Sequence, residues 1–132
     1  MKKTFTISTT SRVELIDITS KVASFVRDSG VNSGICLVYV PHTTAAVTIN
    51  ENADPSVVRD IKAELNKIIP FDDGYTHMEG NSAAHIKATL VGPSEAIPIS
   101  NSQLELGTWQ GIYFCEFDGP RTRTFIVTII KG

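Results

Sequence analysis

The three histidines of the chain lie in two short polar segments that also contain carboxylates, amides and hydroxyls. His42 lies in the segment 40–55, and His77 and His85 lie in the segment 75–85. Imidazoles and carboxylates in one place can bind a metal ion or move protons, and nearby hydroxyls can hold phosphate oxygens. Histidines that serve only packing would be expected to scatter along the sequence. The clustering therefore favours a functional site.

The three imidazoles could together bind a metal ion. Three histidines leave the fourth position of a tetrahedral ion such as zinc open for water or substrate. The spacing matches no zinc motif, because His77 and His85 are eight residues apart and His42 lies 35 residues before His77. Each histidine taken alone is better explained as a hydrogen-bonded loop residue, so only the clustering supports convergence. Glu51 and Glu79 are the carboxylates best placed in the sequence to act as ligand, ligand-orienting group or general base.

Several hydroxyl, amide and basic groups could bind a phosphate. Hydroxyls after a strand end and the free amides of a first helical turn can hold an oxyanion. The candidates are Thr43, Thr44, Gly80, Asn81, Ser82, Lys87 and Arg121. Trp109 is a further candidate, because Gly107 and Gly111 on either side allow a ligand or a second strand to approach closely. Ordinary alternatives are local turn hydrogen bonds for the threonines, solvated positions for the cations and core packing for the tryptophan.

Three segments have the signals of helices. Each begins at a residue whose side chain could cap the first turn, and each ends near a glycine or proline. The expected helices follow Thr19 and end at Gly30, follow the Asp54 cap and run to Ile68, and span 83–90 with Asn81 or Ser82 as the cap. The second is the most regular, because its apolar residues form one stripe at helical spacing. His85 would lie in the first turn or two of the third helix.

Most of the remaining chain has strand patterns. The expected strands lie within 4–11, 13–18, 35–40, 46–49, 96–99, 104–106, 111–117 and 124–130. Pro41 ends one of them, so His42 lies just past a strand end. The residues 118–121, Asp-Gly-Pro-Arg, are a β-hairpin signal between the last two strands. Helices among mostly antiparallel strands indicate a single compact α+β domain over 1–132, with two to three helices.

The strand 124–130 is apolar on both of its faces. It must therefore be covered on both sides, either by helices of its own chain or by a neighbouring subunit.

Composition excludes several classes of protein. A formal net charge of -2 and the absence of any block of like charges argue against nucleic-acid binding. No apolar run approaches the roughly 20 residues that cross a bilayer, and no signal peptide is recognisable, so no membrane association is expected. Cys36 and Cys115 both fall in apolar runs and are interpreted as small buried residues rather than as a disulfide or metal pair. The expected location is cytoplasmic.

The polar segments resemble those of the YjbQ-like family, named the secondary thiamine-phosphate synthase family. The matching stretches are 40–46 (VPHTTAA), 50–55 (NENADP), 77–82 (HMEGNS), 85–88 (HIKA), 107–114 (GTWQGIYF) and 116–121 (EFDGPR). The resemblance implies a compact α+β fold around antiparallel sheet, assembled as a homotrimer. It also implies that the histidines converge on a metal or anion site near a subunit boundary. The metal would be a divalent ion, either zinc or, with a diphosphate substrate, magnesium.

The activity that the resemblance implies joins a hydroxymethylpyrimidine diphosphate to a thiazole phosphate, releasing diphosphate and forming thiamine phosphate. It is attached to the family as a secondary activity. His42, His77 and His85 would hold the metal, and the phosphate-binding candidates would contact the substrates. The same residues would equally suit a metal-bound water that attacks a phosphate ester. A non-catalytic module that binds a phosphorylated metabolite or anion is a further alternative, and a purely structural assembly protein ranks last because it leaves the polar segments unused.

Overall fold

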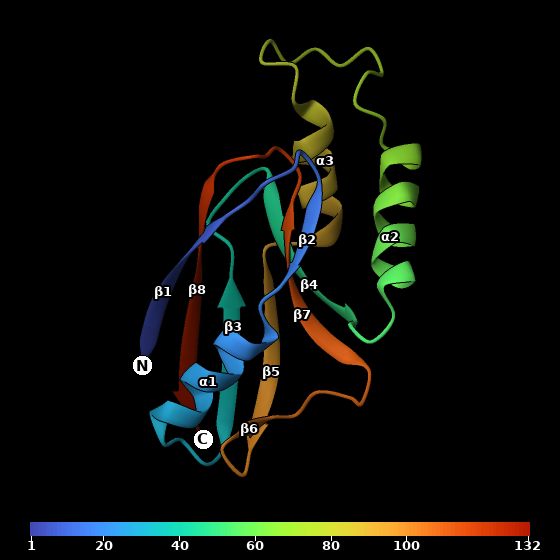
Figure 1. The fold of residues 1–132 in the computed structure, drawn as a ribbon. Coiled ribbons are helices and arrows are strands. Elements are labelled where there is room, and N and C mark those ends of the chain that lie inside the picture. The colour runs from blue at the N-terminus through green and yellow to red at the C-terminus, as the bar shows by residue number, and fades with distance from the viewer.

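The computed structural model describes all 132 residues, which form eight strands and three helices (Figure 1). In chain order they are β1 (Lys2–Ser8), β2 (Glu14–Asp17), α1 (Thr19–Ser29), β3 (Gly34–Tyr39), β4 (Ala45–Glu51), α2 (Pro55–Ile68), α3 (Ser82–Val91), β5 (Ser94–Ser100), β6 (Gln103–Leu104), β7 (Gln110–Glu116) and β8 (Thr122–Lys131). The strands pair antiparallel in two sheets, ordered β1-β8-β3-β5-β6 and β2-β7-β4. The expected α+β domain is confirmed.

The main core lies between the two sheets and is closed by α1. Val22 and Val26 of α1 are fully buried in one apolar cluster with Val38 of β3, Phe125 of β8 and Phe114 of β7. These residues come from both sheets, so the inner face of each sheet is covered. A second, smaller cluster joins α3 to the opposite face of the β2-β7-β4 sheet. In Figure 1, α3 and α2 accordingly stand on the side of that sheet away from α1.

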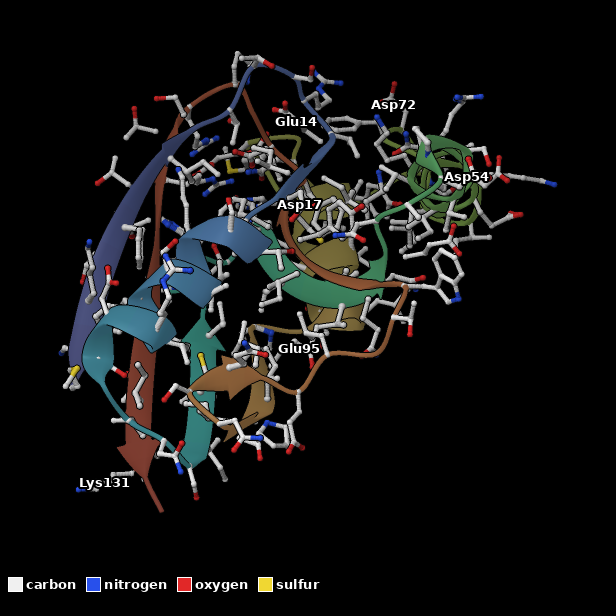
Figure 2. All side chains as sticks on the ribbon, turned by 60° about the horizontal axis from the view of Figure 1, so that its bottom comes forward. Glu14, Asp17, Asp54, Asp72, Glu95 and Lys131 are labelled. Atoms are coloured by element: carbon white, nitrogen blue, oxygen red, sulfur yellow. The ribbon has the colours of Figure 1, made fainter.

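The helix α2 begins as the sequence predicts. The Asp54 carboxylate accepts a hydrogen bond from the Ser56 N–H at 2.9 Å, and Pro55 is the first helical residue. Figure 2 looks along the axis of α2, with Asp54 at its near end. The apolar stripe of α2 is only half-buried, because Val58 and Leu65 pack on the smaller cluster and Ile68 is exposed. No helix of the chain is long and apolar enough to cross a membrane.

Two of the expected capping hydrogen bonds are not made. Thr19 is the first residue of α1 rather than its N-cap, and its hydroxyl accepts the Ile112 N–H at 2.8 Å, which ties the helix to β7. Asn81 stands at the N-cap of α3, but its side chain makes no capping hydrogen bond. It donates to Asp118 instead, at 2.9 Å. In both cases a tertiary hydrogen bond takes the side chain that the local pattern assigns to capping.

The expected hairpin of β7 and β8 is also wrong. β7 pairs with β2 and β4, whereas β8 pairs with β1 and β3. Both edges of each strand are therefore occupied, so β7 and β8 do not pair with each other. The residues 118–121 do form a turn, but the turn carries the chain from one sheet to the other. Gly119 is required there, because a Cβ atom would overlap the Ser11 carbonyl oxygen and the side chains of Thr9 and Glu116.

The outer face of the five-stranded sheet is apolar and carries no helix. Ile35 pairs with Ile130 across β3 and β8, and Tyr39 pairs with Ile126. Ile35, Tyr39 and Ile130 are 47%, 43% and 56% exposed. The strand β8 is therefore buried on its inner face and covered by nothing of its own chain on the outer one.

The two cysteines are free and buried, as expected from the apolar runs in which they lie. Burial raises the pKa of the Cys36 thiol to about 11. Burial and the charge of Glu95 raise the pKa of Cys115 to about 12. Both thiols are therefore protonated near neutral pH.

Candidate functional site

One end of the molecule gathers several polar residues from segments that are distant in the sequence. There β7 ends at Glu116, β8 begins at Thr122 and α3 begins at Ser82, all in the upper part of Figure 1. The segment between β3 and β4 contains His42. We call this region the His42 end. Hydrogen bonds from His42 to Thr124 and from Arg123 to Thr44 bring the segment 40–46 to the first residues of β8.

His42 is held by the first residues of β8. Its ring atom Nε2 lies 3.0 Å from the backbone nitrogen of Thr124 and 3.1 Å from the carbonyl oxygen of the same residue. The ring can therefore accept the Thr124 N–H when Nε2 is unprotonated and donate to the carbonyl when it is protonated. Burial and then the charge of Arg123 lower the pKa of His42, and Arg121 lowers it further. The backbone hydrogen bond and Glu116 offset this only in part.

A buried ion pair lies next to His42. Arg123 donates from Nε to Glu116 Oε1 at 2.9 Å and from Nη2 to Oε2 at 2.5 Å, and the two side chains are 4% and 0% exposed. Glu116 also accepts from the Thr9 hydroxyl at 2.8 Å and from the Asp118 N–H at 3.0 Å. Burial alone would raise the pKa of Glu116, but the hydrogen bonds from Arg123, Asp118 and Thr9 lower it. The carboxylate is therefore fully satisfied as an anion.

Thr44 belongs to this ion pair. Its hydroxyl and its carbonyl accept hydrogen bonds from Arg123 Nη2 at 2.7 and 3.2 Å. The Thr44 side chain is buried, whereas Thr43 is exposed. Arg123 and Glu116 do not stand out in the sequence. The only signal for them is that each charged residue directly adjoins an apolar strand run, where a charge needs a partner.

Asp118 connects the turn to the beginning of α3. Its Oδ2 atom accepts from Arg121 Nη2 and from Asn81 Nδ2, both at 2.9 Å, and its carbonyl accepts from Arg121 Nε at 2.9 Å. The other side-chain atom of Asn81, Oδ1, is buried and has no hydrogen-bond partner. A buried acceptor of this kind normally has a partner, so it marks a position for a donor from water or from a ligand.

His77 and His85 lie against each other. Their ring centroids are 5.5 Å apart and the rings meet edge to face, at 86°. His85 is in the first turn of α3, as expected, and its N–H reaches the Asn81 carbonyl at 3.4 Å. His77 Nε2 lies 4.0 Å from Glu79 Oε2, on an exposed surface. Gly80 has a φ of 74° and donates its N–H to the His77 carbonyl, which closes the turn before α3.

The residues of one chain do not fit a divalent metal ion. No group of three or more histidine, cysteine, aspartate or glutamate side chains lies close enough together to hold one. His77 lies beside His85 and its Nε2 is 4.0 Å from Glu79 Oε2, but His42 is held separately by Thr124 and does not join them. The three-histidine centre is therefore not formed within a single chain.

Glu51 and Trp109 lie at the opposite end of the β2-β7-β4 sheet. In the β4–β7 register, Ala45 faces Glu116 at the His42 end, whereas Glu51 faces Gln110 at the far end. Seven residues of strand span about 20 Å at roughly 3.3 Å per residue, so the fold separates Glu51 from His42 by about that distance within one chain. The Trp109 side chain is 63% exposed, and its carbonyl accepts the Asn52 N–H at 3.0 Å.

Lys87 lies between α2 and α3. Its side chain is 1% exposed, and Nζ donates to Asn66 Oδ1 of α2 at 2.5 Å. Among the basic candidates, Arg121 therefore lies at the His42 end and Lys87 lies between α2 and α3.

Comparison with known proteins gives relatives over the whole chain. The family model described as "UPF0047 protein YjbQ-like" matches residues 3–132. The chain is 52% identical over 131 residues to the UPF0047 protein YugU of Bacillus subtilis, covering 98% of this chain and 99% of the relative. It is 56% identical over 126 residues to a UPF0047 protein of Methanocaldococcus jannaschii, covering 96% and 91%.

Solved structures agree with the sequence comparison. A YjbQ/UPF0047 family protein of Clostridium acetobutylicum superimposes with a TM-score of 0.95 at 54% identity, covering 97% of this chain and 99% of the other. A YbjQ-like protein of Sulfolobus solfataricus superimposes with a TM-score of 0.96 at 34% identity, covering 100% and 97%. The likeness thus extends over the whole domain and includes every segment of the His42 end. The chain belongs to the UPF0047 protein YjbQ-like family.

Proposed function

We propose that the chain is a cytoplasmic transferase with thiamine-phosphate synthase activity. It joins a hydroxymethylpyrimidine diphosphate to a thiazole phosphate and releases diphosphate, as the resemblance of its polar segments implies. This is proposed as a secondary activity of a site that handles phosphorylated small molecules. The two free, buried cysteines support the cytoplasmic location, since paired cysteines are typical of oxidising compartments.

The reaction requires stabilisation of a leaving group more than it requires a base. The bond between the pyrimidine methylene carbon and the diphosphate oxygen breaks, and diphosphate leaves with the electron pair. The lone pair of the thiazole nitrogen forms the new carbon–nitrogen bond. This step itself transfers no proton, and the released diphosphate then takes up one proton near neutral pH. The protein therefore has to position the two substrates and stabilise the negative charge that grows on the diphosphate.

The observation that carries the proposal is the group Arg121, Asp118 and Asn81 at the start of α3. The Arg121 side chain is about half exposed, so part of its guanidinium is free to meet an anion. The first amides of α3 have no side-chain cap, and the positive end of the helix dipole also favours an anion there. Asn81 Oδ1 offers an acceptor for an N–H of the pyrimidine, because no group of the chain uses it.

His42 supplies a group that can hold or release a proton beside this anion site. Its lowered pKa leaves it mostly neutral at pH 7, and Thr124 can bind Nε2 in either protonation state. A neutral imidazole with its proton on Nδ1 can donate that hydrogen to a diphosphate oxygen. Where assembly brings the histidines together, a divalent ion, zinc or magnesium, would stabilise the same negative charge on the diphosphate. One chain alone does not bring together three metal ligands, so no step is assigned to the ion.

We also propose that the chain assembles as a homotrimer. The support is the uncovered apolar face of the β1-β8-β3-β5-β6 sheet, which contains Ile35, Tyr39, Ile126 and Ile130. Assembly through this face would bury those side chains. Assembly could also bring the three histidines and Glu51 together from two chains, because these residues do not meet within one chain.

The activity is tested with purified protein and both precursors, by following diphosphate release and thiamine phosphate formation. Arg121→Gln is expected to lower kcat/KM at least about tenfold, because it removes a charge-assisted contact to the leaving group. The matched control is Arg27→Gln, at an exposed arginine of α1 whose side chain contacts only Asp28 and Ser24 of the same helix.

Three outcomes separate the candidate functions. Thiamine phosphate formation that depends on Arg121 supports the transferase. Phosphate or diphosphate release that does not need the thiazole substrate would identify a hydrolase. Saturable binding of the precursors without turnover would identify a binding module and would refute the transferase.

A further inference from the structure

A second positively charged pocket lies between α2, α3 and the loop that precedes β2, where the Arg12 carbonyl accepts the N–H of Gly119 in the turn 118–121 at 3.1 Å. It has a volume of about 400 Å³ and is lined by Arg12, Val13, Asn66, Phe71 and Lys87. We call it the Lys87 pocket. None of His42, Asn81, Asp118 or Arg121 lines it.

The Lys87 pocket contains two cations and no anion. The Lys87 side chain is 1% exposed, and its one hydrogen bond goes to the neutral amide of Asn66. No carboxylate oxygen lies within 4.0 Å of the Lys87 ammonium or of the Arg12 guanidinium. Buried charges in proteins are normally paired, so this arrangement lacks a counterion. Burial and then the nearby charge of Arg12 lower the pKa of Lys87.

Arg12 is held in place by an aromatic ring. Its guanidinium carbon lies 3.7 Å from the centroid of the Phe71 ring, and the side chain makes no hydrogen bond or ion pair within the chain. A guanidinium that stacks on a ring keeps the N–H groups of its edge free. Phe71 thus orients Arg12 without using its hydrogen-bonding capacity.

The polar groups that line the pocket are hydrogen-bond donors. Lys87 has three N–H groups and uses one of them on Asn66 Oδ1. Because this oxygen accepts from Lys87, the side-chain amide of Asn66 is left with its NH2 group, which has no partner in the chain. Lys87, Asn66 and Arg12 therefore offer donors from three different segments to a ligand that carries only acceptors.

We propose that the Lys87 pocket binds the phosphate group of a small molecule. A phosphate supplies the missing negative charge and has enough oxygen acceptors to meet all three donor groups at once. The site is separate from the anion site at Arg121, and the inference does not rest on the proposed transferase activity.

Calorimetric titration with inorganic phosphate tests the inference on the full chain. Arg12→Gln is expected to weaken binding at least about tenfold, since it removes one of two charges that contact the phosphate. Lys87→Met, which removes the other charge, is expected to abolish binding. Arg59→Gln, at an exposed arginine elsewhere on α2, is the matched control and should bind like the wild type.

Two further measurements separate the possible explanations. The phosphate affinity that Arg12→Gln weakens must be unchanged in Arg121→Gln. If Arg121→Gln abolishes phosphate binding, the phosphate binds at the His42 end and the assignment is overturned. If Lys87→Met does not fold, Arg12→Gln and Asn66→Leu at exposed positions still decide the matter. Unchanged phosphate affinity in both variants, or an equally tight response to acetate, would also overturn it.

Discussion

The guanidinium of Arg123 and the carboxylate of Glu116 form a two-point ion pair between the last residue of β7 and the second residue of β8. The two strands belong to different sheets, so the pair fastens one sheet to the other beside the turn 118–121. Arg123 also holds Thr44, and the next residue, Thr124, holds His42. The geometry of the His42 end therefore depends on this buried pair.

Replacing Glu116 by glutamine should destabilise the fold strongly. Glutamine keeps the shape of the side chain but leaves the Arg123 charge buried without a counterion, which costs about 3–5 kcal/mol when one partner of a buried pair is removed. Urea unfolding measures the loss of unfolding free energy. Glu105→Gln, at an exposed glutamate, is the control and is expected to change stability by less than about 0.5 kcal/mol. Equal stability of the two variants would contradict the structural role of the pair.

The lowered pKa of the Glu116 carboxylate predicts how the free energy of unfolding depends on pH. The folded pKa of Glu116 lies below its ordinary value of 4.5, so its contribution to stability is present above that value. The contribution is lost as the pH falls through the folded pKa. Urea midpoints measured from pH 7 downward should therefore show the difference between the wild type and Glu116→Gln narrowing below about pH 4.5. A difference that stays constant down to pH 3 would be the contrary result.

The charges around His42 predict that its pKa shifts in opposite directions in two variants. Arg121 lowers the pKa of His42 and Glu116 raises it. Removing the positive charge in Arg121→Gln should therefore raise the pKa of His42, and removing the negative charge in Glu116→Gln should lower it. NMR titration of the His42 ring protons measures both shifts in folded protein. Arg27→Gln serves as the control, and a shift of the same sign in both variants would contradict the geometry.

Local signals predict the elements of the fold, but they do not predict how the strands pair. Asp54 caps α2 because its carboxylate reaches the N–H of a residue only two positions away, an interaction that the sequence contains completely. The turn at 118–121 is equally local, yet the strands on either side of it pair elsewhere. Strand pairing is decided by neighbours far along the chain, here β1 and β3 for β8. A turn motif by itself cannot distinguish a hairpin from a crossing between sheets.

Closeness in the sequence is also a poor guide to closeness in the site. Glu51 is nine residues after His42, but the extended strand β4 carries it to the far end of the sheet. Asp118 and Asn81 are 37 residues apart and share a hydrogen bond. The sequence therefore shows which segments are rich in polar residues, whereas the grouping of those residues in space depends on sheet register.

The outer face of the five-stranded sheet predicts self-association. If the chain assembles as the proposed trimer, Ile126→Glu places a charge in this apolar face and should convert the trimer to single chains, because burial of an unpaired carboxylate opposes assembly. Light scattering after gel filtration gives the mass directly. Ile68→Glu, at an exposed apolar residue of α2, is the control and should keep the mass of the wild type. A wild type with the mass of one chain would refute the trimer.

The metal content of the wild type and of Ile126→Glu tests whether assembly brings histidines of different chains together around one ion. One chain does not bring three ligands together, so any divalent ion at the histidines requires ligands from a second chain. The single-chain form of Ile126→Glu, purified without a histidine tag, should therefore contain less than about a tenth of an equivalent of zinc, because metal affinity depends on a complete set of placed ligands. Elemental analysis of the assembled wild type measures whether the trimer completes a site. Stoichiometric zinc in the single-chain variant, lost in His77→Ala, would contradict the arrangement of the histidines described for one chain.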